Sequence, residues 1–294
     1  MRPVPTCTFS SGQAPQVLHG HDLDAYVQIG SLSKTLTGTA LAQLAAKGVL
    51  QPDAPVEQFL PVPRGTGITL RHLAQHTSGL PRLPPRMKRR DPYAAFDDAA
   101  LHSVLQGLDT LATTAPGHTE EYSNLGYAVL GAALTSAAGM SYQDLLDHYV
   151  LVPLGITEVN SSPPPDRRLY SRGLFGRPRR PWTMTGAILP AGGLWATPKA
   201  TADLVTALLV ERKLGEPALS WQKAGPLLWH NGATGDASAF AGAMPDGRWA
   251  LIHRLTNQAD STDELGIKLL QQASPSNSAE QQAPNHPAEQ QEDK

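Results

Sequence analysis

The chain has 294 residues, a formal net charge of −2 and a hydrophobic content of 40%. This length is enough for one large domain with an ample core, and the near-neutral charge gives no reason to expect nucleic acid as a partner. The single cysteine, Cys7, excludes an intramolecular disulfide framework, and no stretch is long and apolar enough to span a membrane.

The two ends of the chain differ in composition from the rest. The first twenty residues lack the apolar core of a secretory signal peptide, so the sequence as written predicts a cytoplasmic protein. A true start further upstream would instead allow an extracytoplasmic one. Residues 273–294 are rich in Gln, Pro, Ser and Glu and contain no large apolar residue. We expect disorder there, because such a segment cannot bury enough surface to offset chain entropy.

Short strands leading into a long helix are the first elements predicted. Residues 6–12 and 16–19 are typical of strands around a turn, and the apolar run 26–29 leads directly into the next segment. Residues 31–47 contain no proline and carry small or apolar side chains at helical spacing, with Gly48 as the stop. Apolar residues on most of its sides indicate that this helix is buried.

The middle of the chain is mostly helical and the end returns to strands. Helices or helical turns are expected at residues 56–60, 68–80, 94–111, 122–138, 141–150, 197–214 and 262–272. A long loop is expected at residues 161–181 and a tight turn at 190–195. An antiparallel meander is expected at residues 227–231, 237–244 and 249–256. This order predicts an α+β fold in which both chain ends build one antiparallel sheet. One domain, residues 1–272, would carry a helical lobe inserted at about residues 50–185.

The first candidate for chemistry is a serine three residues before a lysine. On a helix, this spacing places Ser31 and Lys34 on one face, so that a basic amine can accept the serine proton. The helix start also offers free N–H groups to a developing oxyanion. Ser-x-x-Lys alone is weak evidence, because a capping serine beside a surface lysine gives the same pattern.

Two further clusters complement this pair. Tyr122 precedes Asn124 at the start of a predicted helix, and a phenol can act as a base only if cations lower its pKa from about 10. Asn124 offers both a donor and an acceptor for orienting Lys34 or a substrate amide. The second cluster, at a predicted strand, comprises His230, Asn231, Gly232 and Ala233. Its glycine allows close backbone approach, and the next N–H is a second candidate oxyanion donor.

Two other patterns admit competing interpretations. His72 and His76 lie four residues apart, a spacing that can bind zinc, but no third ligand is near, so we expect no metal site. Residues 81–92 contain five basic side chains. A solvated loop is the leading interpretation, and a patch that attracts an anionic substrate is the alternative.

Taken together, the motifs resemble those of the penicillin-recognising serine hydrolases, in particular the class C β-lactamase, D,D-carboxypeptidase and esterase branch. The matching stretches, all in the family's order, are Ile29-Gly30-Ser31-Leu32-Ser33-Lys34-Thr35, residues 68–73 and 76–80, Tyr122-Ser123-Asn124, Ala191-Gly192-Gly193-Leu194 and His230-Asn231-Gly232. The resemblance spans roughly residues 6–272. It implies a β-lactamase/transpeptidase-like fold, with an antiparallel sheet covered by helices on both faces and a mostly helical second lobe.

The resemblance also implies a role for each matching residue. Ser31 would be the acylated nucleophile, with Lys34 and Tyr122 as its proton-transfer partners, the tyrosine in one version a phenolate. Asn124 would orient the substrate carbonyl side. His230 would replace the lysine of a Lys-Thr-Gly strand and, with Gly232, line the cleft. The N–H groups of Ser31 and Ala233 would form the oxyanion hole. No metal or organic cofactor would be needed.

Three departures from the family pattern bear on the expected activity. Family members usually carry a helix and a strand before the region that corresponds to Thr6, for which this sequence has no room. Asp236 stands where a second glycine is common, and a carboxylate pointing into the cleft would disfavour anionic substrates such as penicillins. His230 is mostly neutral at pH 7, so recognition of a carboxylate there should be weaker or pH-dependent.

The sequence therefore predicts a serine hydrolase that cleaves an amide or ester in a small-molecule or peptide substrate. A β-lactam, a D-Ala-D-Ala-type peptide and a small ester all remain open. The alternative is a catalytically silent binding or sensor domain that uses the same pocket. The sequence does not decide between Lys34 and Tyr122 as the principal base.

Overall fold

The computed structural model describes residues 3–85, 87, 90–173 and 176–275. The predicted disordered tail therefore lies almost entirely outside the described residues, as do Arg86, Lys88 and Arg89 of the basic segment. Of the tail, Ala273 is buried, and Ser274 exchanges hydrogen bonds with Ser11 at the turn between the first two strands.

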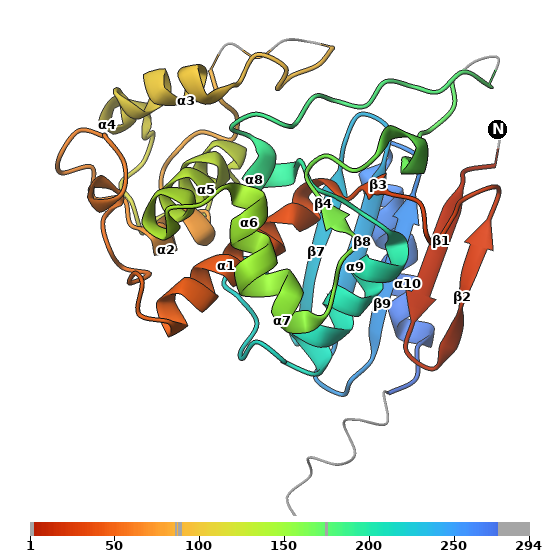
Figure 1. Cartoon of the computed structure of the whole chain (residues 1–294). Coiled ribbons are helices and arrows are strands. Elements are labelled where there is room, and N and C mark those ends of the chain that lie inside the picture. Colours follow the sequence, from red (N-terminus) through yellow and green to blue (C-terminus); the bar gives the residue numbers. More distant parts are fainter. Residues whose placement is uncertain (1–2, 86, 88–89, 174–175, 276–294) are drawn as a thin grey trace, which may run out of the picture.

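A six-stranded antiparallel sheet, built from both chain ends as predicted, forms one half of the molecule (Figure 1). Its strands, in spatial order, are β2 (Gln13–Leu18), β1 (Thr6–Ser10), β9 (Trp249–Arg254), β8 (Ser238–Ala243), β7 (Leu227–Ala233) and β6 (Gln222–Ala224). In register, Cys7 of β1 faces His253 of β9, which joins the N-terminal hairpin to the C-terminal meander. The three-residue β6 is an additional edge strand that the sequence did not predict.

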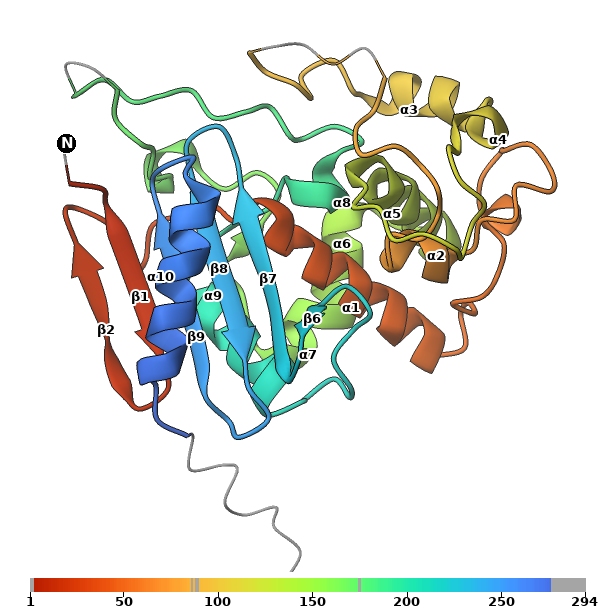
Figure 2. The same cartoon turned by 180° about the vertical axis from the view of Figure 1, so that it is seen from behind.

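Helices cover both faces of this sheet. The final helix α10 (Ala259–Gln272) packs on one face, over β8 and β9, and α9 (Pro198–Val205) lies on the other, as Figures 1 and 2 show from opposite sides. The buried helix predicted at 31–47 begins with a 3₁₀ turn, Gly30–Leu32, and continues as α1 (Ser33–Ala46). It runs between the sheet and the helical half of the molecule.

The helical half holds the remaining helices. They are α2 (Leu70–Ala74), α3 (Asp98–Leu105), α4 (Leu108–Leu111), α5 (Asn124–Ala138), α6 (Tyr142–Leu146), α7 (Val152–Leu154) and α8 (Leu189–Gly192). The sequence marks several of their starts, since Thr69, Asp97, Ser123 and Ser141 each accept a hydrogen bond from a first-turn N–H. Within the described residues, no helix is both long and apolar enough to cross a membrane.

The segment predicted as a tight turn at 190–195 is instead a short helix followed by a strand. Helix α8 leads into β5 (Trp195–Ala196), which lies between β3 (Val27–Gln28) and β4 (Val159–Asn160) in a small second sheet. Four helical residues are too few for periodicity to show in a sequence. Tertiary packing fixes the segment: Thr37 donates to the Pro190 carbonyl, and Gly131 of α5 leaves room for the Pro190 ring.

Candidate active site

The turn that carries Ser31 is pressed against the end of β7. Gly30 has a φ of +54°, and a β-carbon built there would lie 2.7 Å from the Ala233 nitrogen. A β-carbon on Gly232 would lie 2.0 Å from the Ile29 carbonyl oxygen. Only glycine fits at these two positions, and at Gly232 the backbone that approaches closely is that of Ile29. As a result, the backbone nitrogens of Ser31 and Ala233 meet at one end of the sheet.

The Ala233 N–H points away from the neighbouring strand β8, toward the turn that carries Ser31. Thr234 donates its N–H to Ala237, at the end of the β7–β8 pair. Because the N–H groups of successive residues in a strand point to opposite sides, Ala233 directs its own N–H away from β8. This places the Ala233 N–H on the side of the Ser31 turn, where the sequence predicts an oxyanion hole.

Lys34 is fully buried, and three oxygen atoms surround its amine. Its Nζ lies 3.2 Å from Ser31 Oγ, 2.7 Å from Asn124 Oδ1 and 2.5 Å from the Ala191 carbonyl oxygen. The Asn124 and Ala191 oxygens can only accept, so a neutral amine would use its two N–H bonds on them and direct its lone pair at the Ser31 hydroxyl. The site is thus arranged for a lysine that takes a proton from the serine.

Burial favours this neutral amine. Desolvation lowers the pKa of Lys34 well below its ordinary value of 10.5, and the positive charge of Arg82 lowers it further. Asn124 is held in turn by Tyr93, since its Nδ2 donates to the Tyr93 hydroxyl at 2.8 Å. This bond fixes the amide with its oxygen toward Lys34.

Tyr122 lies beside this pair but is not a phenolate. Its ring centre is 4.7 Å from Lys34 Nζ, and its hydroxyl shares a hydrogen bond with Ser31. Burial raises the pKa of Tyr122 to about 12, and the bond with Ser31 offsets only part of that rise. The positive charge of Arg82 does not overcome desolvation, so the phenol keeps its proton at neutral pH, contrary to the phenolate version of the expectation.

His230 does not line the cleft as expected. Side chains alternate along β7, so Asn231 and Ala233 reach the cleft while His230 and Gly232 are buried on the face toward α1. The His230 ring packs behind Tyr122 with ring centres 6.4 Å apart, and its Nδ1 lies 2.6 Å from the Asn231 carbonyl oxygen. A carbonyl only accepts, so the hydrogen of the neutral ring is on Nδ1.

Both histidines near Tyr122 are neutral. Desolvation and the neighbouring Lys34 lower the pKa of His230 to about 3, and burial lowers that of His76 to the same value. His76 stacks on Tyr122 at 4.5 Å between ring centres and accepts a hydrogen bond from the Ser123 N–H. His72 faces the Thr69 N–H instead, and the described residues contain no group of three potential metal ligands.

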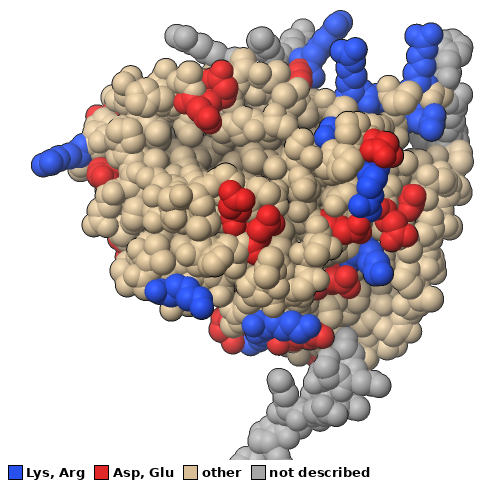
Figure 3. All heavy atoms as spheres, viewed as in Figure 1, with Lys and Arg blue, Asp and Glu red and all other residues tan. Residues whose placement is uncertain are grey.

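Asp236 is not a cleft residue either. Its carboxylate is buried and accepts a hydrogen bond of 2.8 Å from Ser171, in the long arginine-rich loop. The expected repulsion of anionic substrates by this side chain therefore has no basis in the structure. Two arginines of that loop also contact protein: Arg167 is paired with Glu158, and Arg168 is stacked over Trp195. Figure 3 shows Lys and Arg side chains projecting from the edge of the molecule where this loop runs.

The residues around Ser31 enclose a cleft of about 840 Å³. Its described lining includes Ser31, Arg82, Met87, Pro92, Tyr93, Tyr122, Asn124, Trp182, Gly192, Gln222, Trp229, Asn231, Ala233 and Asp260. Sequence reasoning gave no site role to Tyr93, Trp182 or Asp260. Arg82, assigned to a solvated loop, is exposed but also lies 5.2 Å from the centre of the Tyr122 ring. Its place directly after the motif at 76–80 was the signal that could have identified it.

Comparisons with known proteins agree with this geometry. Residues 14–274 match the protein family described as Beta-lactamase. The D-alanyl-D-alanine-carboxypeptidase/endopeptidase AmpH of Escherichia coli is 34% identical over 184 residues, which are 60% of this chain and 47% of that protein. Penicillin-binding protein 4* of Bacillus subtilis is 30% identical over 50% of this chain and 31% of its own length. The chain thus spans about half or less of these curated relatives.

Solved structures extend the similarity to the whole fold. A beta-lactamase/D-alanine carboxypeptidase from Yersinia pestis matches with a TM-score of 0.74 and 21% identity, over 91% of each chain. A class C beta lactamase from Rhodobacter sphaeroides matches with a TM-score of 0.72 and 18% identity, over 91% of this chain and 94% of that one. These structures confirm the predicted fold, and the match of residues 14–274 to the family confirms the resemblance predicted from the motifs.

Proposed function

Because the chain belongs to the beta-lactamase family, we propose that it is a serine hydrolase that cleaves an ester or amide through a covalent acyl-enzyme on Ser31. The observation that carries the proposal is the environment of Lys34. Two obligate acceptors, Asn124 Oδ1 and the Ala191 carbonyl, occupy two N–H bonds and leave the lone pair for Ser31. A buried neutral lysine is an effective general base near neutral pH.

In the first half of the reaction, Ser31 Oγ transfers its proton to Lys34 and attacks the substrate carbonyl carbon. The negative charge that develops on the carbonyl oxygen is stabilised by the N–H groups of Ser31 and Ala233. Tyr122 then gives its hydroxyl proton to the departing oxygen or nitrogen and regains a proton from Lys34. The acyl group stays on Ser31, and the leaving group departs neutral.

In the second half, water attacks the acyl-enzyme. Lys34, neutral again after the first half, takes one proton of the water. When the tetrahedral intermediate collapses, Lys34 passes that proton to Ser31 Oγ and the acid product is released. Asn124 keeps contact with both Lys34 and the cleft throughout, since it lines the cleft and accepts from Nζ. No metal ion enters any of these steps.

The family relatives suggest which substrates to test. AmpH is named a D-alanyl-D-alanine carboxypeptidase and endopeptidase, so a D-Ala-D-Ala peptide is one candidate here. A penicillin and a small activated ester are the others. The neutral His230 cannot bind a substrate carboxylate as an ammonium would, and this favours substrates that do not depend on such a contact.

The test is intact-mass spectrometry of the protein mixed with p-nitrophenyl acetate and, separately, with a penicillin. We expect a mass gain that is absent from Ser31→Ala and retained by Ser103→Ala, which removes an exposed hydroxyl on α3. A long-lived penicillin adduct would indicate a peptidase-like protein, and rapid ester turnover would indicate an esterase. If Ser31→Ala is acylated like the wild type, Ser31 is not the nucleophile. An absence of adducts with both reagents would favour the alternative of a silent binding domain.

A further inference from the structure

Two hollows adjoin the cleft, and they differ in chemistry. The first, which we call the α3 pocket, has a volume of about 500 Å³ and shares Met87 and Pro92 with the cleft. Its inner wall is formed by Phe96, Ala100, Val104 and Leu111. None of the described residues that line it carries a charge. Its volume is within the range of about 300–1,000 Å³ that small-molecule sites occupy.

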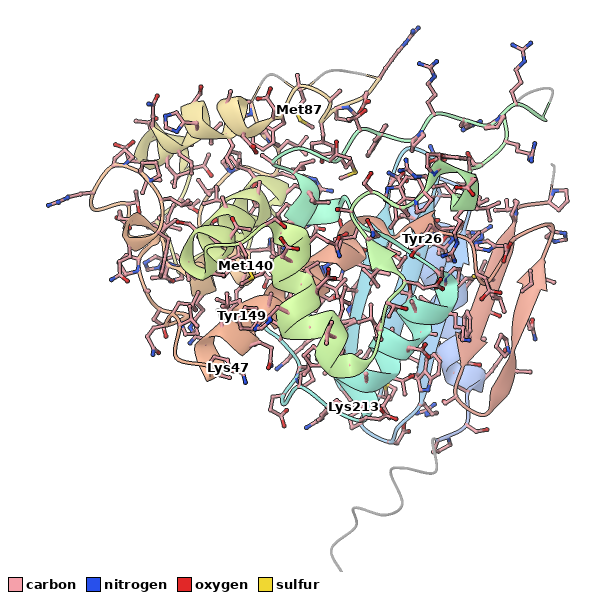
Figure 4. The ribbon with its side chains drawn as sticks, in the orientation of Figure 1. Tyr26, Lys47, Met87, Met140, Tyr149 and Lys213 are labelled. Atoms are coloured by element: carbon pink, nitrogen blue, oxygen red, sulfur yellow. The ribbon has the colours of Figure 1, made fainter. Side chains whose placement is uncertain are left out.

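The second hollow, of about 850 Å³, is polar. It shares Tyr122, Gln222 and Trp229 with the cleft, and four charged residues, Glu120, Arg212, Glu216 and Lys223, line it. It shares no lining residue with the α3 pocket. Figure 2 places α3 and β6 on opposite sides of α1, and Figure 4 shows Met87 near α3 and far from Lys213.

The position of Tyr122 orients a substrate between these hollows. In the proposed reaction the leaving group receives its proton from Tyr122, so it must lie over that side chain, where the cleft opens into the polar hollow. The acyl part then extends the other way, past Asn124 and Tyr93. Met87 and Pro92 form that wall, and beyond them is the α3 pocket.

We propose that the α3 pocket binds an apolar acyl chain of the substrate, and that the leaving group on the Tyr122 side is polar. This deepens the proposed function and rests on it for the direction of the substrate. The hydrolase would then prefer medium-chain acyl esters or amides to acetyl ones. Burial of apolar surface would raise kcat/KM by up to about fourfold for each methylene that enters the pocket.

The test is a series of p-nitrophenyl esters from acetate to octanoate, which share one leaving group. For the wild type we expect kcat/KM to rise with chain length. Ala100→Phe places a ring in the α3 pocket from a partly buried position, and we expect it to flatten the series while acetate hydrolysis stays within about twofold. Ala99→Phe is the matched control, since Ala99 is exposed on the same helix and does not line the pocket.

Unfolding of Ala100→Phe would show in its circular dichroism, and Ser103→Phe, from the exposed rim of the same pocket, then replaces it. A wild-type series that is flat or falls with chain length would overturn the proposal. So would an Ala100→Phe series that rises as steeply as that of Ala99→Phe. In both cases acetate hydrolysis would continue, so the proposed function would stand.

A binding measurement keeps the proposal testable without catalysis. Calorimetric titration of the Ser31→Ala protein with free octanoate and free butyrate should show at least tenfold tighter binding of octanoate. Adding Ala100→Phe to the Ser31→Ala protein should remove this difference. Equal affinities of the Ser31→Ala protein for the two would overturn the pocket assignment. Chain-length-dependent binding by a wild type that hydrolyses none of the esters would support the pocket and contradict the proposed hydrolase.

Discussion

Lys34 on α1 and His230 on β7 are two buried nitrogen bases beside the same tyrosine, and they are held very differently. Lys34 has three oxygen partners from three separate elements. His230 has its own neighbour's carbonyl at Nδ1, and its Nε2 has no hydrogen-bond partner among the described residues. Both pKa values are lowered, mainly by burial. The difference indicates that α1, α5 and α8 position the groups that transfer protons, whereas β7 contributes backbone groups and shapes the cleft.

The strongest way to break this comparison is to remove the Lys34 amine. Lys34→Met keeps the apolar volume but leaves Ser31 without a proton acceptor, and we expect kcat/KM for p-nitrophenyl acetate to fall at least 10³-fold, at the strong end of the roughly 10²–10⁴ range for general base catalysis. Lys34→Arg should be similarly inactive, because a guanidinium stays protonated. Activity of Lys34→Met within tenfold of the wild type would remove Lys34 from the mechanism.

A smaller effect is expected from the tyrosine between them. Tyr122→Phe keeps the ring on His76 but loses the hydroxyl that protonates the leaving group, and we predict a loss of about 10²-fold. The loss should be larger for an alkyl ester than for the p-nitrophenyl ester, since a good leaving group needs less protonation. Equal losses for both esters in steady-state assays would mean that Tyr122 acts elsewhere in the cycle.

The smallest catalytic effect belongs to His230. His230→Gln is expected to lower kcat/KM less than tenfold. In the wild type, the KM of a carboxylate-bearing substrate should not change between pH 5 and 8. With a pKa of about 3, the native imidazole stays neutral across that range. A KM that rises through pH 6.5 only in the wild type would show that His230 does bind the carboxylate as a cation.

His230 should matter more for stability in acid. Its folded pKa of about 3 lies below the unfolded value of about 6.5, so the unfolded chain binds the extra proton between these values. Stability is therefore lost as pH falls from about 6.5 toward 3, at about 1.4 kcal/mol per pH unit. Urea denaturation at pH 7, 6 and 5 gives the free energy of unfolding at each pH. Between pH 7 and 5, this free energy should fall less for His230→Gln than for the wild type. An equal fall for both proteins would contradict the buried neutral imidazole.

How far the sequence predicts this site depends on whether a residue acts through local spacing or through packing. Ser31 and Lys34 are one helical turn apart, and Ser123 caps α5, so the nucleophile pair and the position of Asn124 follow from patterns within single elements. The sheet built from both chain ends also follows, because alternation and turn residues mark its strands. These parts required no knowledge of long-range contacts.

The site features that the sequence did not predict depend on contacts between distant segments. No pattern in the sequence places the Ala191 carbonyl on Lys34 or the Tyr93 hydroxyl on Asn124, since both partners come from segments whose course is set by packing. The expected position of His230 was wrong because strand alternation turns it away from the cleft. The phenolate expectation for Tyr122 was wrong because desolvation outweighs the positive charge of Arg82.

The most direct test of the central claim is the pH dependence of Ser31 acylation, measured by single-turnover mixing with p-nitrophenyl acetate between pH 5 and 11. If neutral Lys34 is the base, the acylation rate should rise with its deprotonation and level off well below pH 10.5, and Lys34→Met should lack this transition. A wild-type rate that keeps rising through pH 10.5 would mean that Lys34 is protonated in the resting site, and would contradict the account.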